Sequence, residues 1–130
     1  MFWIALSALI MTLTGAGDDT YVIRKFIAHA HEAVAAHVQD EARKRAATAT
    51  LDDASRAFEK HRVRVGRMSD CLAKLDRSYT ATQAEYERCL TDLAPAWDAA
   101  AEDLIVLDAR LREAVAPPEL AAIMRDTDPQ

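Results

Sequence analysis

Two stretches of this chain carry apolar residues at alternating spacings of three and four, and this pattern constrains the fold more than any other. One stretch covers residues 51–79 and the other residues 86–114. Each pattern places one mostly apolar stripe along a helix, in the manner of a coiled-coil seam. The stripes consist of Leu51, Ala54, Phe58, His61, Val65, Met68, Leu72, Leu75 and Tyr79, and of Tyr86, Leu90, Leu93, Trp97, Ala100, Leu104, Leu107, Leu111 and Ala114.

The segment between the two stretches predicts that they fold back on each other. It is short, and Thr82 followed three residues later by Glu85 has the form of a capping box that starts a new helix. Two long amphipathic helices joined by a short connection become antiparallel neighbours. Pro95 lies inside the second stretch, but the apolar pattern keeps its phase across it. We therefore expect a kinked helix there and not a break at Ala94.

The only two cysteines support the same hairpin. A register that pairs Leu51 with Leu107 aligns the two stripes, and it also brings Cys71 beside Cys89. We expect an intramolecular disulfide, which closes a loop of about 18 residues and stabilises the fold by roughly 3 kcal/mol. A structural disulfide implies an oxidising compartment. A reactive thiol pair is the alternative.

Residues 1–17 form an apolar membrane anchor or signal-like segment without charged side chains before Asp18. A secretory signal peptide with Thr14-Gly15-Ala16 as its cleavage site is one interpretation, although a basic first part is missing. The segment is also shorter than the roughly 20 residues that usually span a bilayer. We expect a retained anchor completed by neighbouring subunits; burial in a partner protein is the remaining alternative.

The expected fold class is all-α: an apolar anchor helix, then an elongated helical bundle built on an antiparallel coiled-coil hairpin that one disulfide staples. Residues 18–50 are expected to form a connecting amphipathic helix over residues 21–47. A capping-box-like sequence at residues 50–53 predicts a break or bend before the hairpin of residues 51–116, with an uninterrupted rod as the alternative. Pro117 and Pro118 end the last long helix, and a C-terminal tail of residues 117–130 holds a possible short helix.

Charge and motifs argue against several function classes. The net charge is −5, and no large basic face is left over for nucleic acid. Residues 51–78 carry seven basic and five acidic side chains, whereas residues 82–115 carry three basic and eight acidic ones. Opposite signs favour pairing of the two arms. The sequence has no phosphate-binding loop, nucleophile elbow or CxxC motif, so we expect no enzyme, no catalytic residues and no cofactor.

The histidines are the remaining candidates for metal binding. His37 and Glu41 lie one helical turn apart, but two ligands on one turn do not make a metal site. His29 and His31 point to different faces of a helix. We therefore expect no metal site. His61, placed opposite Trp97 in the seam, is expected to have a structural role.

Small residues beside the seam are the candidate interaction surface. They allow another helix to approach closely, either residues 21–47 of the same chain or a helix of a partner. Tyr79, at the tip of the hairpin, is expected either to contact a partner or to close the last layer of the seam. The candidate interaction residues are Ala57, Ala94, Ala96, Ala101 and Tyr79.

These features favour a membrane-anchored, extracytoplasmic accessory or scaffold subunit that acts through protein–protein interaction. The expected location is a bacterial-type inner membrane, with residues 2–17 in the membrane and the helical domain in the periplasm. Its partners would be other protein subunits, in a membrane complex or a homo-oligomer. In layout alone the chain is similar to phage inner-membrane spanins. The alternatives are a secreted binding module with a cleaved signal peptide and a redox or metal-handling protein.

Overall fold

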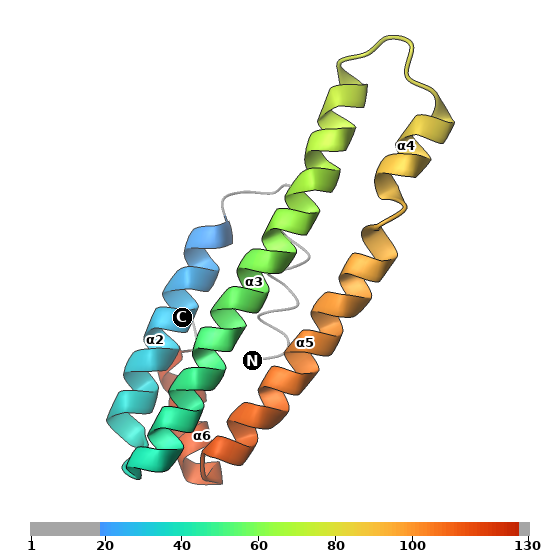
Figure 1. Cartoon of the computed structure of the whole chain (residues 1–130). Helices are drawn as coiled ribbons and strands as arrows, with labels where there is room; N and C mark the ends of the chain where they lie inside the picture. The colour runs from blue at the N-terminus through green and yellow to red at the C-terminus, as the bar shows by residue number, and fades with distance from the viewer. Residues whose placement is uncertain (1–18, 128–130) are drawn as a thin grey trace.

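The computed structural model describes residues 19–127, with side chains from Ile23 onward, and all regular structure in this range is helical. The predicted all-α class and the antiparallel hairpin are confirmed (Figure 1). The predicted anchor of residues 1–17 lies outside the described residues. Within residues 19–127, no helix combines the length and apolar character needed to cross a membrane. The helices are α2 (Asp19–His37), α3 (Glu41–Asp76), α4 (Gln83–Leu90), α5 (Leu93–Ala114) and α6 (Pro117–Thr127).

The hairpin consists of α3 as one arm and α4 followed by α5 as the other (Figure 1). The predicted capping box is present at the start of α4. The backbone N–H of Thr82 donates to Glu85 Oε2 at 2.7 Å, and the backbone N–H of Glu85 donates to Thr82 Oγ1 at 3.4 Å. These bonds satisfy N–H groups that the first turn of a helix leaves without partners.

The second arm is interrupted, so the prediction of one kinked helix is wrong. α4 ends at Leu90 and α5 begins at Leu93, which places Pro95 in the first turn of α5. Proline is tolerated there because the first N–H groups of a helix have no intrahelical acceptor, whereas in a continuous helix its ring would clash with the carbonyl of Thr91. The interruption also changes the phase of the stripe: Ala96 is buried, while Leu90 and Leu93 are 41% and 37% exposed.

The bend before the hairpin lies earlier than expected. α2 ends at His37, and α3 begins at Glu41 and continues through residues 50–53 without interruption. Asp40 caps α3, because its Oδ1 accepts a hydrogen bond from the backbone N–H of Arg43 at 2.8 Å. The predicted break at residues 50–53 is therefore wrong. The predicted helix over residues 21–47 is also wrong, because the chain turns at residues 38–40.

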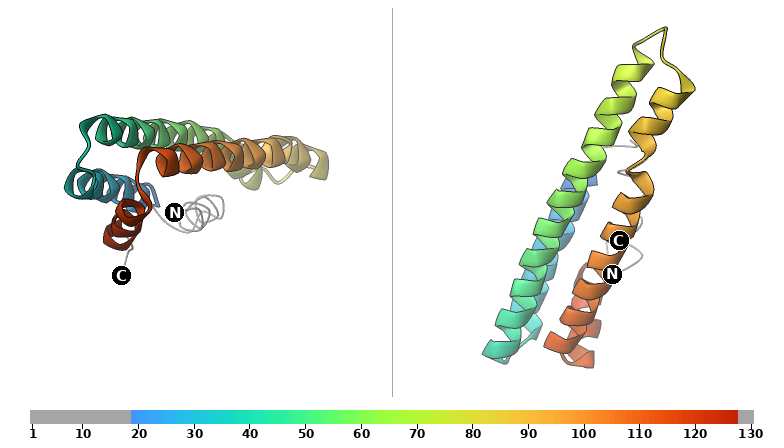
Figure 2. Two further views of the ribbon diagram at one scale, coloured as in Figure 1. Left: turned by 90° about the horizontal axis from the view of Figure 1, so that it is seen from below. Right: turned by 45° about the vertical axis from the view of Figure 1, so that its right-hand side comes forward.

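The main hydrophobic core lies where α2, α3, α5 and α6 meet, an end of the molecule that we call the base (Figure 2). Alanines alternate with larger residues in this core, which lets the helices pack closely. A second, smaller cluster of Val65, Met68 and Ala96 lies further along the hairpin. The base core comprises Ala30, Ala33, Val34, Val38, Ala47, Leu51, Leu111, Ala114, Val115 and Ile123.

Candidate interaction surface at the stapled end of the hairpin

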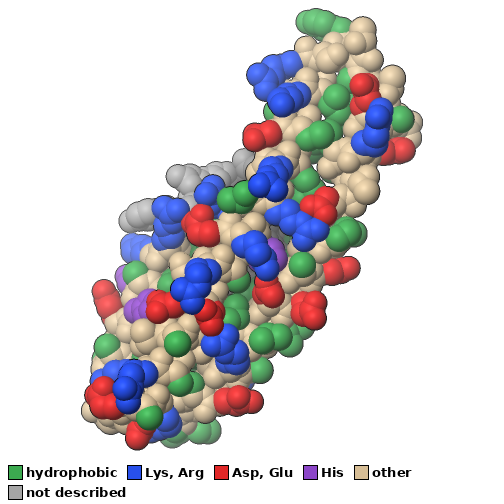
Figure 3. Space-filling model, viewed as in Figure 1, with side chains coloured by type: hydrophobic (Ala, Val, Ile, Leu, Met, Phe, Trp, Pro, Cys, Tyr) green, Lys and Arg blue, Asp and Glu red, His purple; other side chains and the backbone are tan. Residues whose placement is uncertain are grey.

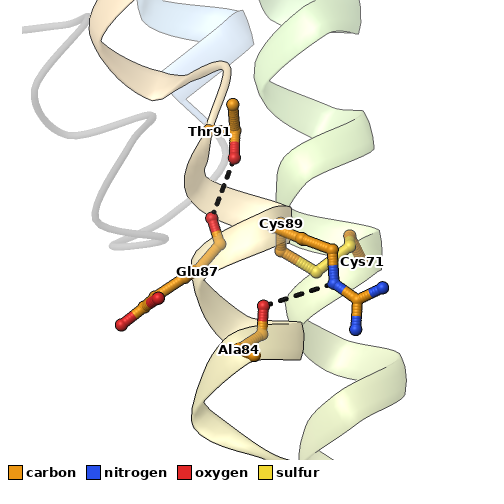
Figure 4. The surroundings of a disulfide bond; sticks show 6 residues. Cys71, Ala84, Glu87, Cys89 and Thr91 are labelled. Atoms are coloured by element: carbon orange, nitrogen blue, oxygen red, sulfur yellow. Dashed lines mark hydrogen bonds between the residues drawn. A yellow bond between two sulfur atoms is a disulfide. The ribbon is translucent and has the colours of Figure 1, made fainter.

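A disulfide joins Cys71 of α3 to Cys89 of α4, as the sequence predicted (Figure 4). Their Cα atoms are 5.7 Å apart, within the usual range for a disulfide. Cys89 is buried, and the first arm meets the second at this point. We call residues 68–92 the stapled end; in Figure 1 it projects beyond α2 and α6.

Between the disulfide and the tip, Tyr86 and Asp76 join the two arms. The Tyr86 hydroxyl donates to Asp76 Oδ1 at 2.9 Å, and this hydrogen bond to a carboxylate raises the pKa of the Tyr86 hydroxyl. Tyr79, at the tip, is fully exposed. It therefore closes no layer of the seam, and its role as a partner contact stays a prediction.

A groove with basic walls lies beside the disulfide. Its lining includes Met68 and both cysteines, together with Arg64, Arg67 and Arg88. Lysine and arginine side chains are numerous on this face of the upper hairpin (Figure 3). Glu59 and Asp92 also line the groove, so it combines apolar side chains with charged ones, of which the basic outnumber the acidic.

Arg64, which lines the groove, pairs with Asp92 at the interruption of the second arm. Arg64 Nε donates to Asp92 Oδ2 at 2.6 Å, and a second Arg64 nitrogen donates to the other carboxylate oxygen. These hydrogen bonds hold the pKa of Asp92 below its usual value. A bidentate arginine–carboxylate pair fixes orientation as well as distance. Asp92, the residue that precedes α5, is thereby held against α3.

Exposed apolar side chains occur in the groove, at Val63, and on the residues that directly follow its lining residues Cys89 and Asp92. Val63 on α3 is 45% exposed, and Leu90 and Leu93 on the second arm are exposed because of the interruption. The sequence pattern assigned both leucines to the seam and so missed them as surface residues. The available signal was Pro95, whose position fixes where a helix can begin.

The structure distributes the predicted alanines over different environments. Ala96 is buried against Val65 and Met68, so it faces α3. Ala57 and Ala101 are half-buried, and Ala94 is exposed. Ala57 lines a pocket that also includes residues of α2 and α5. The four alanines therefore do not share one uniform face.

A polar cluster missed by sequence reasoning lies inside the hairpin. His61 is buried and its Nε2 lies 2.8 Å from Asp103 Oδ2, a partner that the sequence analysis did not anticipate; its position opposite Trp97 stays a prediction. Lys60 Nζ donates to the same oxygen at 3.1 Å. Burial alone would raise the pKa of Asp103, but the hydrogen bonds from His61 and Lys60 outweigh burial and lower it. The cluster joins the two arms of the hairpin, since Lys60 and His61 belong to α3 and Asp103 belongs to α5.

The remaining histidines pair with carboxylates. His37 Nε2 lies 2.6 Å from Asp126 Oδ2, and His31 Nε2 lies 3.2 Å from Asp52 Oδ1. Across residues 19–127, no group of three or more histidine, cysteine, aspartate or glutamate side chains is arranged to hold a metal ion. No protein-family model matches the chain, and neither a curated protein nor a solved structure matches it.

Proposed function

We propose that this protein is a membrane-anchored, extracytoplasmic accessory or scaffold subunit, and that it binds partner proteins through the stapled end of its hairpin. The observation that carries the proposal is the projection of this end beyond the base (Figure 1). A disulfide holds it, and exposed apolar and basic side chains surround it. Rigid presentation of apolar and arginine side chains is typical of protein-binding surfaces.

The cysteines support the proposed compartment. Both cysteines of the chain are in the disulfide, and structural disulfides persist in oxidising compartments. In a bacterial-type cell this is the periplasmic side of the inner membrane. Residues 2–17 are the proposed attachment to that membrane, because they are apolar and uncharged.

The chemistry of the stapled end points to the kind of partner. Arg67 and Arg88 supply positive charge at the groove, and Leu90 and Leu93 supply exposed apolar area on the second arm. A partner helix with acidic and apolar residues complements such a surface, since opposite potentials steer association and apolar contacts stabilise the complex. A subunit of a membrane complex and a second copy of this chain both meet this description.

A second candidate is a secreted binding module that begins after residue 17. It is favoured by the base core, whose described members all lie within residues 30–123. The same stapled end would then be the binding surface.

Photo-cross-linking in native membranes tests the proposed surface. A photoreactive residue replaces Tyr79 or Leu90 in one set of variants, and Glu113, exposed near the end of α5, in the control. We expect a defined cross-linked product from the stapled end only, and its loss when Cys71 and Cys89 are both replaced by serine. A product from Glu113 alone, or the same product from every position, would contradict the assignment.

A further inference from the structure

An apolar pocket lies between α2, α3 and α5, away from the stapled end. Three of its lining residues come from the first turns of α2, five from α3 and five from α5. Its apolar lining includes Ile23, Phe26, Ile27, Phe58, Leu104 and Leu107. Phe26, Ile27, Phe58 and Leu104 are only half-buried among the described residues.

The pocket coincides with an unfilled helix position of the bundle. Near the base, α6 packs against the second half of α2, where Ile123 joins Val34 and Val38 in the core (Figure 2). At about 1.5 Å per residue, α6 reaches roughly 16 Å and α2 roughly 28 Å. Among the described residues, the first half of α2 therefore has no fourth helix beside it, and the pocket lies there.

We propose that residues 2–13 of the same chain dock in this pocket as the fourth helix whenever they are not in lipid. These residues are uncharged, and only Ser7 and Thr12 among them are polar. As a helix they would extend roughly 18 Å, which is enough to cover the roughly 12 Å of α2 that α6 leaves open.

Connectivity selects this segment over other occupants. Residues 14–18 join it directly to the start of α2, within a turn or two of Ile23 and Phe26. A connection of about five residues is ordinary between packed helices, and Gly15 and Gly17 ease the reversal of direction. Tethering also gives the segment a high effective concentration at the pocket compared with any free partner.

This inference rests on the retained N-terminal segment of the proposed function and adds a second location for it. Lipid and the pocket are alternative apolar surroundings for the same residues. Insertion into a membrane would empty the pocket and expose Ile27 and Leu104, whereas docking would keep the segment from water before insertion.

Trp3 provides the test, because the chain has only two tryptophans. In a full-length Trp97→Phe background, the emission and acrylamide quenching of Trp3 are measured without detergent, with the monomer verified by sedimentation. Leu104→Gln alters the pocket. Ile105→Gln is its matched control, since Ile105 is the next residue and is 59% exposed. Ile27→Ala is a second, milder pocket variant, and circular dichroism checks the helix content of each.

Docking predicts a blue-shifted Trp3 in the monomer and at least a threefold rise in its quenching constant in Leu104→Gln or Ile27→Ala, with no change in Ile105→Gln. A solvent-exposed Trp3 in the monomer would overturn it. Shielding of Trp3 that grows with protein concentration would also overturn it, since a second copy of the chain would then be what shields Trp3. Vesicles with brominated lipids separate the two proposals: quenching by lipid without shielding in solution overturns docking alone, and shielding without quenching by lipid overturns the anchor alone.

Discussion

Three polar side chains are buried among the described residues, and their partners differ in kind. Thr50 and Thr127 donate to carbonyl oxygens of their own helices, at 2.9 and 2.8 Å. His61 instead depends on the other arm, through Asp103, and its Nδ1 is buried without a partner. A buried polar group that loses its partner costs more than the hydrogen bond contributed. His61 therefore makes the middle of the hairpin sensitive to changes at Asp103.

Replacing Asp103 by alanine should reduce the free energy of unfolding by about 1–3 kcal/mol, because it leaves His61 buried without its partner. Asp98→Ala is the matched control: Asp98 is an exposed carboxylate on the same helix, and its replacement should change stability by less than about 0.5 kcal/mol. Urea denaturation measures both. Equal effects of the two substitutions would show that the contact between His61 and Asp103 does not stabilise the hairpin.

Acid should destabilise the protein at low pH. Hydrogen bonds from basic side chains or backbone N–H groups lower the pKa of several carboxylates in the folded state. A lowered pKa gives stability that is present above the unfolded value and is lost as the pH falls through the folded value. The urea midpoint should therefore be steady down to about pH 5 and fall below about pH 4; a midpoint that rises below pH 4 would contradict this. Besides Asp103, the groups are Asp53, Glu59, Glu85, Asp92, Glu119 and Asp126.

At the scale of elements, the hairpin was predictable because several local signals agreed. The capping box at Thr82 and the two cysteines each fixed the fold-back independently of the apolar stripes. The interruption at residues 91–92 was not predictable from the stripes, because Leu90 and Leu93 fit the apolar pattern. The pairing of Asp92 with Arg64, a tertiary contact, helps to hold the chain in the observed phase.

Local sequence signals were also insufficient to place the bend and α6 at the base. Asp40 is a good N-cap residue, but the capping-box-like sequence at residues 50–53 competed with it and lies inside a continuous helix. Residues 117–130 were expected to be a tail with a possible short helix; α6 is that helix, and its Ile123 is among the most buried side chains described. A short helix after a proline pair shows no sequence sign of the core that it joins.

The disulfide should stabilise the stapled end more than the base. The hydrophobic cluster next to it contains only Val65, Met68 and Ala96, so few apolar contacts hold α4 to α3. Replacing Cys71 and Cys89 by serine should lower the free energy of unfolding by about 3 kcal/mol. Hydrogen exchange should accelerate in α4 and in the last turns of α3, and stay slow around Val34. Equal acceleration in α2 would show that the base depends on the disulfide.

At the scale of the molecule, the two ends of the structure are held together in different ways. The base holds the main core and joins four helices, whereas the stapled end carries exposed groups and a covalent link. The arms are also joined by charge, since basic residues of α3 meet acidic residues of the second arm at Arg64–Asp92 and Lys60–Asp103. Such a division allows one end to bind while the other keeps the fold.

Truncation of a base residue tests this division. Ile123→Ala should reduce the free energy of unfolding by about 2–5 kcal/mol, because it leaves a cavity among α2, α3, α5 and α6. The control is Ile105→Ala on the exposed face of α5, with an expected effect below about 1 kcal/mol. If both variants unfold at the same denaturant concentration, α6 is not part of the stabilising core.

The intact mass of the chain, isolated from the membranes of its native cells in the presence of a thiol-blocking reagent, tests the central claim most directly. The proposed membrane-anchored, extracytoplasmic subunit predicts a single species that retains residues 1–17 and carries no blocking group, because Cys71 and Cys89 are joined. Two blocking groups per chain would contradict the oxidising compartment. A chain that begins near Asp18 and is recovered in the soluble fraction would contradict the anchor.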